Sequence, residues 1–319
     1  MYREFYGFSE APFAQSPDPK FLYLTRSHFE ALSSMMSGIK NRKGVIVITG
    51  EVGTGKTTLI YALLKDLSEK IKIAFVFHPG FGPKDLLKNI LLDLDVPISE
   101  TEQNLLYFVS EFRRYLNERL TRDEIMAVVI DEAQNLDEEA LEGLGRFCDL
   151  DTPAGGVLQI LLVGHPELEV KLNSEKLWRF KQKINVNRQI TPLTREEGRE
   201  YIEHRLKLAG RNIPQVFTSD AANRIWEFAQ GIPRVINLLC DRALVNGFTK
   251  SSPIIDSKIV KEAMKELDYL RPANSNPFLQ KLFSLKKTGY KVVRVFFMLL
   301  SFLLFIYTLR KLLAVMLHR

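Results

Sequence analysis

A glycine-rich segment at residues 50–57 limits most strongly how this chain can fold. It reads GEVGTGKT and matches the spacing G-x-x-x-x-G-K-[ST] in full. The glycines of such a loop let backbone N–H groups turn inward around phosphate oxygens, and the lysine adds a positive charge. The segment lies between a β-branched run at residues 45–48 and an apolar-periodic stretch at residues 56–68. The sequence therefore predicts a strand, a phosphate-binding loop and a helix, whose positive end adds to the anion field.

The phosphate loop predicts a set of nucleotide contacts. The Lys56 ammonium group is expected to reach the β- and γ-phosphates, and the Thr57 hydroxyl is expected to ligate Mg²⁺. The alternative is a glycine-rich turn with an incidental lysine, which the flanking strand and helix patterns argue against. The chain has no NKxD-type guanine motif, so ATP is the predicted nucleotide. The residues assigned to nucleotide binding are Gly50, Glu51, Val52, Gly53, Thr54, Gly55, Lys56, Thr57 and Thr58.

A second apolar run, residues 126–130, ends in the two carboxylates of Asp131 and Glu132. This arrangement predicts that Asp131 lies at the carboxyl edge of a sheet, where it would hold Mg²⁺ through the water shell of the ion. Glu132 would orient or deprotonate the attacking water. The alternative is a pair of solvated acids at a strand end. Residues 131–134 (DEAQ) also resemble a helicase box, but the chain after residue 192 is too short for a second RecA-like lobe.

Apolar runs and helical patterns alternate along the first 192 residues. A capping box, Ser27-x-x-Glu30, is predicted at the start of the first helix. Strands are expected at residues 45–48, 73–77, 126–130, 157–163 and 184–190, and helices at residues 28–39, 56–68, 84–94 and 103–120. Strands separated by helices indicate an α/β fold with a parallel, doubly wound sheet.

After Pro192 the pattern becomes helical, with four helices expected to begin near residues 194, 219, 234 and 256. This predicts a small all-helical domain behind the sheet domain. The expected organisation is an aromatic and proline-rich N-terminal segment (residues 1–24), a P-loop core (25–192), a helical lid (193–270), a basic linker (271–291) and a C-terminal membrane helix (292–317).

Two further loops are candidates for contact with the nucleotide. The segment Gly231-Ile232-Pro233-Arg234 stands at a helix start and resembles the second-sensor signature of AAA+ ATPases, in which Arg234 would reach the γ-phosphate. The alternative is a Gly-Pro helix junction with a surface arginine. His165, just past the fourth expected strand, can hydrogen-bond the γ-phosphate or the attacking water, and it can equally be a loop histidine without a catalytic part. The catalytic assignments are Glu132, Lys56, Arg234 and His165.

The sequence resembles the ExeA/GspA family of AAA+ ATPases, which is found with bacterial general secretion and exopolysaccharide export. The resemblance spans about residues 1–270 and is most specific in the N-terminal aromatic block. It is carried by Phe5-Tyr6-Gly7-Phe8, Pro12-Phe13, Pro17-Asp18-Pro19, His28 and residues 49–58, 129–134, 161–168 and 231–239. The resemblance implies a P-loop AAA+ fold, ATP and Mg²⁺ as cofactors, and a homo-oligomer whose sites are completed by a neighbouring copy. Its implied partners are envelope export proteins of the inner membrane.

Two departures from the family pattern matter. The family commonly has Q-R-I before the fifth strand, where an arginine can reach a neighbouring site, whereas this chain has Gln182-Lys183-Ile184. Arg179 or Arg188 is the alternative source of that contact. Secretion members also continue beyond a membrane helix into a periplasmic domain. With ten residues after Leu309, we expect the C-terminal helix of this chain to act as an anchor instead.

Residues 295–309 contain no charge and predict a membrane helix. Fifteen residues span only about 22 Å, but residues 292–317 span about 39 Å if the intervening basic side chains snorkel, which exceeds the ~30 Å hydrocarbon core. The chain from 271 to 294 has six Lys or Arg residues against three from 310 to 319, so its N-terminal side is expected to be cytoplasmic. The alternatives are an interfacial helix and a helix packed in the core. The N-terminus lacks signal-peptide features, so the ATPase body is expected to face the cytoplasm at the bacterial inner membrane.

The net charge of +6 is unevenly distributed. Nine of the 44 basic residues and none of the 38 acidic residues lie in residues 271–319, which leaves residues 1–270 with a net charge of −3. Nucleic acid is therefore not the expected partner. The expected function is a membrane-anchored ATPase that drives or regulates assembly of an envelope secretion or export apparatus. The alternatives are an ATP-dependent DNA-binding regulator of the transposition type, using a local basic patch, and a scaffold that binds ATP without turnover.

Overall fold

The structure is a computed structural model that describes residues 1–67, 71–77, 79, 82–99, 101–122, 124–148, 156–210 and 215–267. Met1–Glu266 forms one compact unit. In the described part of the chain, no helix combines the length and the apolar character needed to cross a membrane. The C-terminal membrane helix predicted at residues 292–317 lies outside the described residues.

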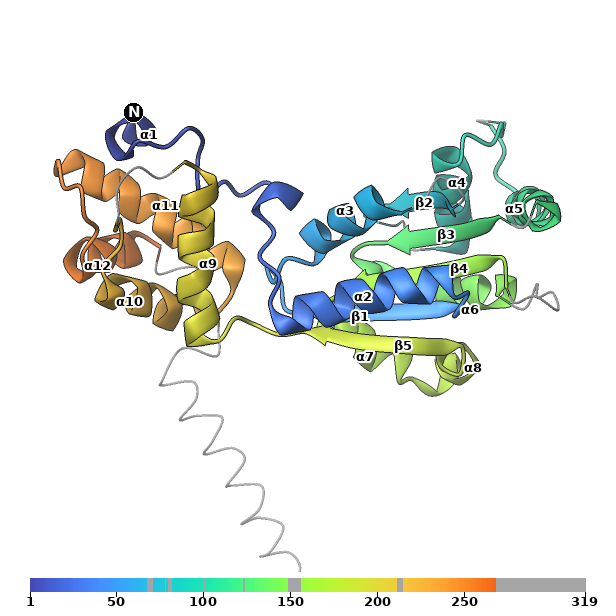
Figure 1. Cartoon of the computed structure of the whole chain (residues 1–319). Helices are drawn as coiled ribbons and strands as arrows, with labels where there is room; N and C mark the ends of the chain where they lie inside the picture. Colours follow the sequence, from blue (N-terminus) through green and yellow to red (C-terminus); the bar gives the residue numbers. More distant parts are fainter. Residues whose placement is uncertain are drawn as a thin grey trace, which may run out of the picture. The chain divides into compact units, whose positions relative to one another are not determined.

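Five parallel strands form a single sheet in the order β2-β3-β4-β1-β5 (Figure 1). The strands are β1 (Val45–Gly50), β2 (Ile71–Val76), β3 (Ile125–Ile130), β4 (Leu158–Gly164) and β5 (Ile184–Ile190). The predicted α/β fold with a parallel sheet is confirmed. This order places β4 between β1 and β3, and parallel strands end at one edge of the sheet. The phosphate loop, the Asp131–Glu132 pair and the His165 loop therefore follow three adjacent strands.

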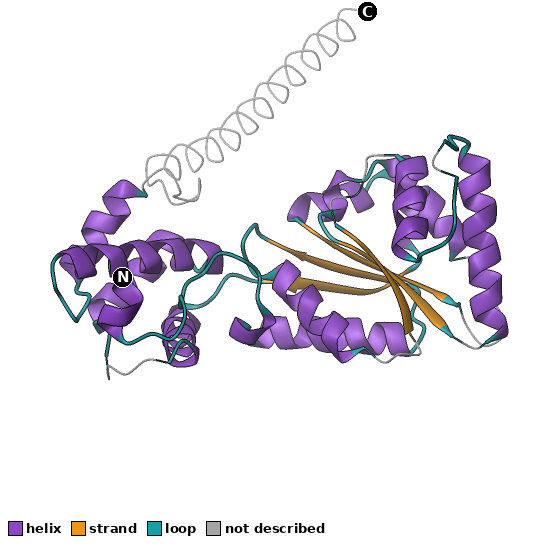
Figure 2. Ribbon diagram, turned by 90° about the horizontal axis from the view of Figure 1, so that it is seen from above, coloured by secondary structure: helices purple, strands orange, loops and turns teal. Residues whose placement is uncertain are grey.

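Helices cover both faces of the sheet (Figure 2). On one face lie α2 (Arg26–Lys40) and α3 (Lys56–Asp66), and on the other lie α4 (Pro83–Asp93), α5 (Leu105–Thr121) and α6 (Glu138–Phe147). Successive strand residues alternate between these layers, so that Ile46 packs under α2 and α3 while Val47 packs under the opposite helices. Burial on both faces explains why the central strands β1, β3 and β4 are nearly continuous apolar runs, whereas the edge strands β2 and β5 contain exposed polar residues.

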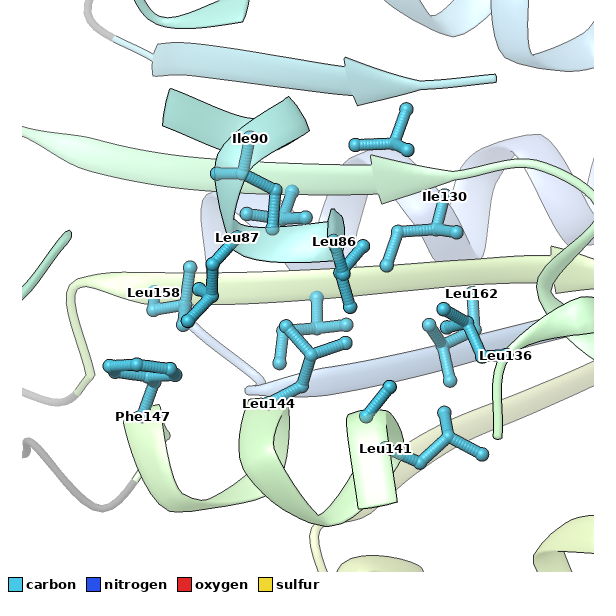
Figure 3. Packing of buried hydrophobic residues seen from close by; sticks show 14 of the residues in the cluster. Leu86, Leu87, Ile90, Ile130, Leu136, Leu141, Leu144, Phe147, Leu158 and Leu162 are labelled. Carbon is cyan, nitrogen blue, oxygen red and sulfur yellow. The ribbon is translucent and has the colours of Figure 1, made fainter. Parts of the chain in front are cut away.

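The core between the sheet and the α4–α6 layer is built mainly from leucine, isoleucine, valine and phenylalanine side chains, some of which Figure 3 shows. Helix α6 is not among the helices predicted from the sequence. Its N-cap is Asp137, whose side chain accepts a hydrogen bond from the nitrogen of Ala140 at 2.7 Å. The side chains shown packing in this layer are Leu86, Leu87 and Ile90 from α4, Leu141, Leu144 and Phe147 from α6, and Ile130, Leu158 and Leu162 from the strands.

Short helices follow β4, and a group of four longer helices follows β5. Helices α7 (Pro166–Leu172) and α8 (Trp178–Lys181) lead from β4 to β5. The next four are α9 (Arg195–Leu208), α10 (Ser219–Ala229), α11 (Pro233–Thr249) and α12 (Ser257–Glu266). The start of α9 is a capping box, in which Thr194 and Glu197 each accept a hydrogen bond from the other's backbone nitrogen.

The N-terminal segment is ordered against these helices. It contains α1 (Tyr2–Tyr6) and a single 3₁₀ turn, η1 (Pro19–Phe21), joined by irregular chain. The Tyr6 hydroxyl donates to the carbonyl oxygen of Ser252 at 2.9 Å, and the Ser9 hydroxyl donates to that of Ala209 at 3.0 Å. Tyr6, Phe8, Phe13 and Phe21 are buried. The aromatic residues of this segment therefore pack on the body.

Candidate functional site: a phosphate loop at the carboxyl edge of the sheet

The phosphate loop connects β1 to α3 through two glycines in left-handed backbone conformations. Gly53 has φ +82° and Gly55 has φ +97°, which L side chains rarely adopt. A Cβ atom on Gly53 would also lie 2.7 Å from the Cβ atom of Arg234. Inside the loop the buried Thr54 hydroxyl donates to the carbonyl oxygen of Glu51 at 2.8 Å. The glycines thus permit both the turn of the loop and its close contact with the chain at Arg234.

The Lys56 ammonium group lies inside this loop. Only 6% of the residue is exposed, and its Nζ atom donates to the carbonyl oxygens of Gly50 and Glu51 at 2.9 and 3.0 Å. Burial lowers the pKa of Lys56, while the nearby carboxylates of Glu132 and Asp131 act in the opposite direction. A positive charge held in a buried loop beside a helix start is suited to binding phosphate oxygens.

Thr57 in the first turn of α3 meets Asp131 just past the end of β3. The Thr57 hydroxyl donates to Oδ2 of Asp131 at 2.6 Å, and Oδ1 of Asp131 accepts from the nitrogen of Glu132 at 2.9 Å. Asp131 is fully buried, and this burial raises the pKa of its carboxyl group although both hydrogen bonds oppose the shift. One hydroxyl and one carboxylate in contact supply the hard oxygen ligands that Mg²⁺ prefers, so these residues fit a magnesium site.

Glu132 has an unusual backbone and a fixed side chain. Its φ of +56° is left-handed although it is not a glycine, which is uncommon and is often found at functional sites. Its Oε2 atom accepts a hydrogen bond from Nε2 of Gln134 at 2.6 Å and lies 3.4 Å from Nε2 of His165. The structure therefore brings together Glu132 and His165, two of the residues selected from the sequence, at the ends of adjacent strands.

Arg234 contacts the phosphate loop from α11. Its main-chain nitrogen donates to the carbonyl oxygen of Gly53 at 3.2 Å, and its side chain is exposed along the cavity. The turn before α11 requires Gly231, because a Cβ atom there would lie 2.2 Å from the carbonyl oxygen of Leu193 and because its φ is +75°. Gly231 thus lets the end of α10 approach the connection from β5.

A cavity of about 350 Å³ lies over the phosphate loop and extends to residues that the sequence analysis did not select. We call it the nucleotide cavity. Besides Glu132, His165, Arg234 and most of the loop, it is lined by Pro17, Asp18, Phe21, Leu22 and Tyr23 from the N-terminal segment and by Tyr201, Arg205 and Asn237 from α9 and α11. The density of aromatic residues in the first 24 positions indicates packing, but nothing in it indicates this cavity.

Arg205 attaches the N-terminal segment to α9 along this wall. Its guanidinium group donates to the carbonyl oxygen of Pro12 at 2.6 Å and to that of Ala14 at 3.3 Å, and it lies over the Phe21 ring at 4.5 Å. The same group donates to the Tyr201 hydroxyl at 3.1 Å. Only 6% of Arg205 is exposed, so its hydrogen bonds hold backbone that would otherwise lack a partner.

His28 is a second contact with the loop that the sequence pattern did not single out as a site residue. It is buried in the first turn of α2, where its Nε2 atom donates to the carbonyl oxygen of Thr54 at 2.9 Å. Its Nδ1 atom lies 2.6 Å from the hydroxyl oxygen of Thr25, so it accepts a hydrogen bond there. A carbonyl oxygen can only accept, which fixes the neutral tautomer with the proton on Nε2.

Comparison with known proteins agrees with this geometry. A family profile described as an AAA domain matches residues 39–172. General secretion pathway protein A of Aeromonas hydrophila is 35% identical over 271 residues, which cover 85% of this chain and 49% of that protein. The chain is a P-loop AAA+ ATPase, and over 85% of its length it is similar to an ATPase of the ExeA/GspA type. It spans about half the length of the curated relatives that it matches.

Two more distant proteins share parts of this AAA+ chain. An uncharacterized HTH-type transcriptional regulator of Methanocaldococcus jannaschii is 28% identical over 194 residues, which cover 56% of this chain and 44% of that protein. The ORC2 protein of Aeropyrum pernix, solved as ADPNP–ADP complexes, superimposes with a TM-score of 0.63 and 20% identity over 81% of this chain and 72% of that one. This structural likeness shows the fold.

Proposed function

We propose that this chain is a membrane-anchored AAA+ ATPase that binds and hydrolyses ATP to drive or regulate assembly of a bacterial envelope secretion or export apparatus. The observation that supports hydrolysis best is the 2.6 Å hydrogen bond from the Thr57 hydroxyl to the Asp131 carboxylate. Glu132 is the next residue after Asp131, and Thr57 is the last residue of the phosphate loop. The name of the Aeromonas hydrophila relative supports a place in secretion. The nucleotides bound to the ORC2 protein support ATP as the ligand.

The proposed reaction uses the residues at the ends of β1, β3, β4 and the start of α11. The loop N–H groups and Lys56 bind the β- and γ-phosphates, and Thr57 and Asp131 hold Mg²⁺. When bound, this ion neutralises charge on the phosphate oxygens. Water attacks the γ-phosphorus and gives a proton to Glu132, while the bond from phosphorus to the bridging oxygen breaks, which yields ADP and phosphate. His165 orients the attacking water, and Arg234 contacts the γ-phosphate from the lid.

Two variants test this assignment. Glu132→Gln should retain ATP and lose turnover, because the loop and the magnesium ligands remain while the proton acceptor is removed. Lys56→Ala should lose ATP binding, because the phosphates lose the loop cation, and Lys65→Ala on the exposed side of α3 serves as its matched control. ATP binding by fluorescence titration and phosphate release in the same preparations separate the two effects. A wild-type rate in the Glu132→Gln protein would exclude this glutamate as the base.

We further propose that the chain acts as a homo-oligomer at the cytoplasmic side of the inner membrane, with envelope export proteins as partners. Exposed arginines on either side of the Gln182-Lys183-Ile184 segment support a contact between copies. Arg179 is exposed beside the exposed ring of Trp178, and Arg188 is exposed on β5. The charge-free run at residues 295–309 supports the anchor. Sedimentation of full-length protein with and without ATP tests the oligomer.

The second candidate is an ATP-dependent DNA-binding regulator. It is favoured by the match to a transcriptional regulator and by exposed basic residues on and around α8, namely Lys176, Arg179 and Lys181. Against it, residues 1–270 have a net charge of −3. DNA affinity that falls steeply with salt and depends on these three side chains would favour the regulator. If genes of a secretion or export apparatus lie next to the gene for this chain, that would favour the export ATPase. A neighbouring transposase gene would favour the DNA-binding regulator.

A further inference from the structure

Gln134 joins the carboxylate of Glu132 to the end of β4. Its Oε1 atom accepts a hydrogen bond from the main-chain nitrogen of His165 at 3.0 Å, and its Nε2 atom donates to Oε2 of Glu132 at 2.6 Å. A backbone N–H can only donate, so the oxygen of the amide must face His165 and the nitrogen must face Glu132. The amide orientation is therefore determined by the backbone of the β4 loop.

The second proton of the Gln134 amide group determines which tautomer the neutral His165 ring adopts. Nε2 of Gln134 lies 3.2 Å from Nδ1 of His165, so Nδ1 accepts and the ring proton lies on Nε2. That Nε2 atom is 3.4 Å from Oε2 of Glu132. Both contacts fall on the same carboxylate oxygen, and Oε1 of Glu132 remains as the acceptor for a proton.

The surrounding backbone is shaped to admit this side chain. A Cβ atom on Gly164 would lie 2.7 Å from Oε1 of Gln134 and 3.3 Å from its main-chain nitrogen. Lys171 on α7 donates to the carbonyl oxygen of Gln134 at 2.6 Å. The Glu132 backbone is left-handed, so the chain reverses tightly between the carboxylate and the amide that holds it. Gln134 is thus held in place in three ways. Gly164 leaves room for its side chain, Lys171 bonds its carbonyl oxygen, and the turn at Glu132 brings it next to the carboxylate.

We propose that Gln134 is a positioning residue that holds Oε2 of Glu132 against the end of β4 and thereby directs Oε1 toward the attacking water. This inference rests on the proposed hydrolysis by Glu132. The same amide transmits any displacement of the His165 loop to the carboxylate, because it bonds to both. Contact of His165 with the γ-phosphate would therefore change the position of the base through Gln134 as well as through the direct 3.4 Å approach of the His165 ring.

Steady-state ATP hydrolysis and equilibrium ATP binding of full-length Gln134→Ala and Gln134→Glu test this role. For Gln134→Ala we expect kcat to fall about 10- to 100-fold, as for a misplaced catalytic group, with ATP affinity within about twofold of wild type. Gln103→Ala is the matched control, because Gln103 is exposed, pairs with Lys84 and lies outside the nucleotide cavity. Its kcat should equal that of wild type.

Gln134→Glu keeps the shape of the side chain and tests the donor specifically. The introduced carboxyl group lacks a proton to donate when ionised and repels Glu132, but when protonated it again offers one donor and one acceptor. Its kcat relative to wild type should therefore rise as the pH is lowered. This recovery depends on the hydrogen bond and would not follow from a merely structural role.

The outcomes separate this inference from the proposed function. A Glu132→Gln protein with a wild-type rate would overturn hydrolysis by Glu132 itself. An inactive Glu132→Gln protein together with a wild-type kcat in both Gln134 variants would overturn only the positioning role. Parallel loss of kcat and ATP binding in both variants, with no recovery at lower pH, would also overturn it. If Gln134→Ala does not fold, the pH dependence of Gln134→Glu decides alone.

Discussion

The main-chain nitrogen of Arg234 donates a hydrogen bond to the carbonyl oxygen of Gly53 at 3.2 Å, which joins the first turn of α11 to the phosphate loop. The two residues also approach closely enough that a Cβ atom on Gly53 would lie 2.7 Å from that of Arg234. The contact uses backbone atoms, so it does not depend on the Arg234 side chain. The guanidinium group therefore remains available to a ligand in the nucleotide cavity.

Replacing Arg234 by alanine should lower ATP turnover more than ATP affinity. The backbone contact with Gly53 is retained and the loop keeps its lysine, while the proposed guanidinium contact with the γ-phosphate is lost. Removal of one such electrostatic contact typically costs about 10²- to 10³-fold in kcat. Arg242→Ala on the same helix is the control, since Arg242 pairs with Glu266 and does not line the cavity. If the Arg234→Ala protein had the ATP titration curve and the hydrolysis rate of wild type, Arg234 would be a surface residue without a part in the reaction.

The buried His28 should make the stability of the fold depend on pH. Burial lowers the pKa of His28 below its ordinary value of 6.5, and the hydrogen bond to the Thr54 carbonyl and the charge of Glu197 oppose this only in part. As the pH falls below 6.5, the unfolded chain binds a proton that the folded chain does not bind. The contribution of His28 to stability is therefore present above pH 6.5 and is lost as the pH falls toward the lower folded-state value.

The variant His28→Gln tests that dependence. An amide can still donate to the Thr54 carbonyl oxygen but does not titrate, so the free energy of unfolding should vary less between about pH 6.5 and pH 5 than in wild type. At higher pH the variant should be less stable by about 1 kcal/mol, because it cannot match both hydrogen bonds of the imidazole. Urea unfolding across this pH range measures both effects. If the free energy of unfolding varied with pH in the same way in both proteins, His28 would not be the source of the pH dependence.

The strands and the phosphate loop could be predicted because their causes are local. A parallel strand covered on both faces must be apolar along its length, and the runs expected at residues 45–48, 126–130 and 157–163 occur as the three central strands. The strands expected at residues 73–77 and 184–190 occur at the two edges of the sheet, where polar residues are exposed. The loop is a motif of eight consecutive residues, so its position follows from spacing alone. The end of β5 at Ile190 likewise coincides with the last apolar residue of its run.

Contacts between distant segments could not be predicted in this way. Periodicity tells which face of an element is buried, but it does not tell which loops meet at its end. Gln134 and His165 are 31 positions apart, and Arg205 and Pro12 are 193 apart. Only the strand order, with β4 between β1 and β3, brings the first pair together.

One local prediction was wrong, and one helix was not predicted. The capping box Ser27-x-x-Glu30 was predicted, but Thr25 is the N-cap of α2, and Glu30 pairs with Arg26. Both Thr25 and Ser27 are favourable caps, and the bond between Thr25 and His28 selects the first. Helix α6 contains two glycines, which weaken its intrinsic preference, and burial of its leucines on the sheet compensates.

Removing the guanidinium group of Arg205 should loosen the N-terminal segment. Arg205→Met leaves the carbonyl oxygens of Pro12 and Ala14 without their donor, at a cost of about 1–3 kcal/mol for each buried acceptor. For a chain of this size a loss of 1 kcal/mol lowers Tm by about 2–4 °C. Because Phe21 and Leu22 line the nucleotide cavity beside Arg205, the KM for ATP should rise as well.

The control for this variant is Arg199→Met, six residues earlier on α9, where an exposed arginine bonds Asn223 instead. It should leave Tm within about 2 °C of wild type, since exposed substitutions usually change stability by less than about 0.5 kcal/mol. Limited trypsin digestion supplies a second readout, because cleavage after Lys20 should become faster only in the Arg205 variant. Equal digestion rates in the two variants would show that Arg205 does not hold the segment.

The last prediction concerns residues 291–319. The phosphate loop, Asp131, Glu132 and Arg234 all belong to the compact unit Met1–Glu266, and so do the N-terminal contacts that complete the cavity wall. Deleting residues 291–319 should therefore release a body that remains folded, binds ATP and hydrolyses it. The full-length protein should stay with the membrane in high salt and in carbonate, because burial of the charge-free run at residues 295–309 holds it rather than its basic flanks.

Fractionation of cells that express each form, followed by ATP binding on the released body, decides between the alternatives for this segment. Release of the full-length protein by salt alone would indicate an interfacial helix held by charge, since electrostatic binding is screened at high ionic strength while apolar burial is not. Aggregation of the shortened protein with loss of ATP binding would indicate that the segment packs against the ATPase body. Retention of the full-length form with a soluble, active shortened form is the result that a membrane anchor requires.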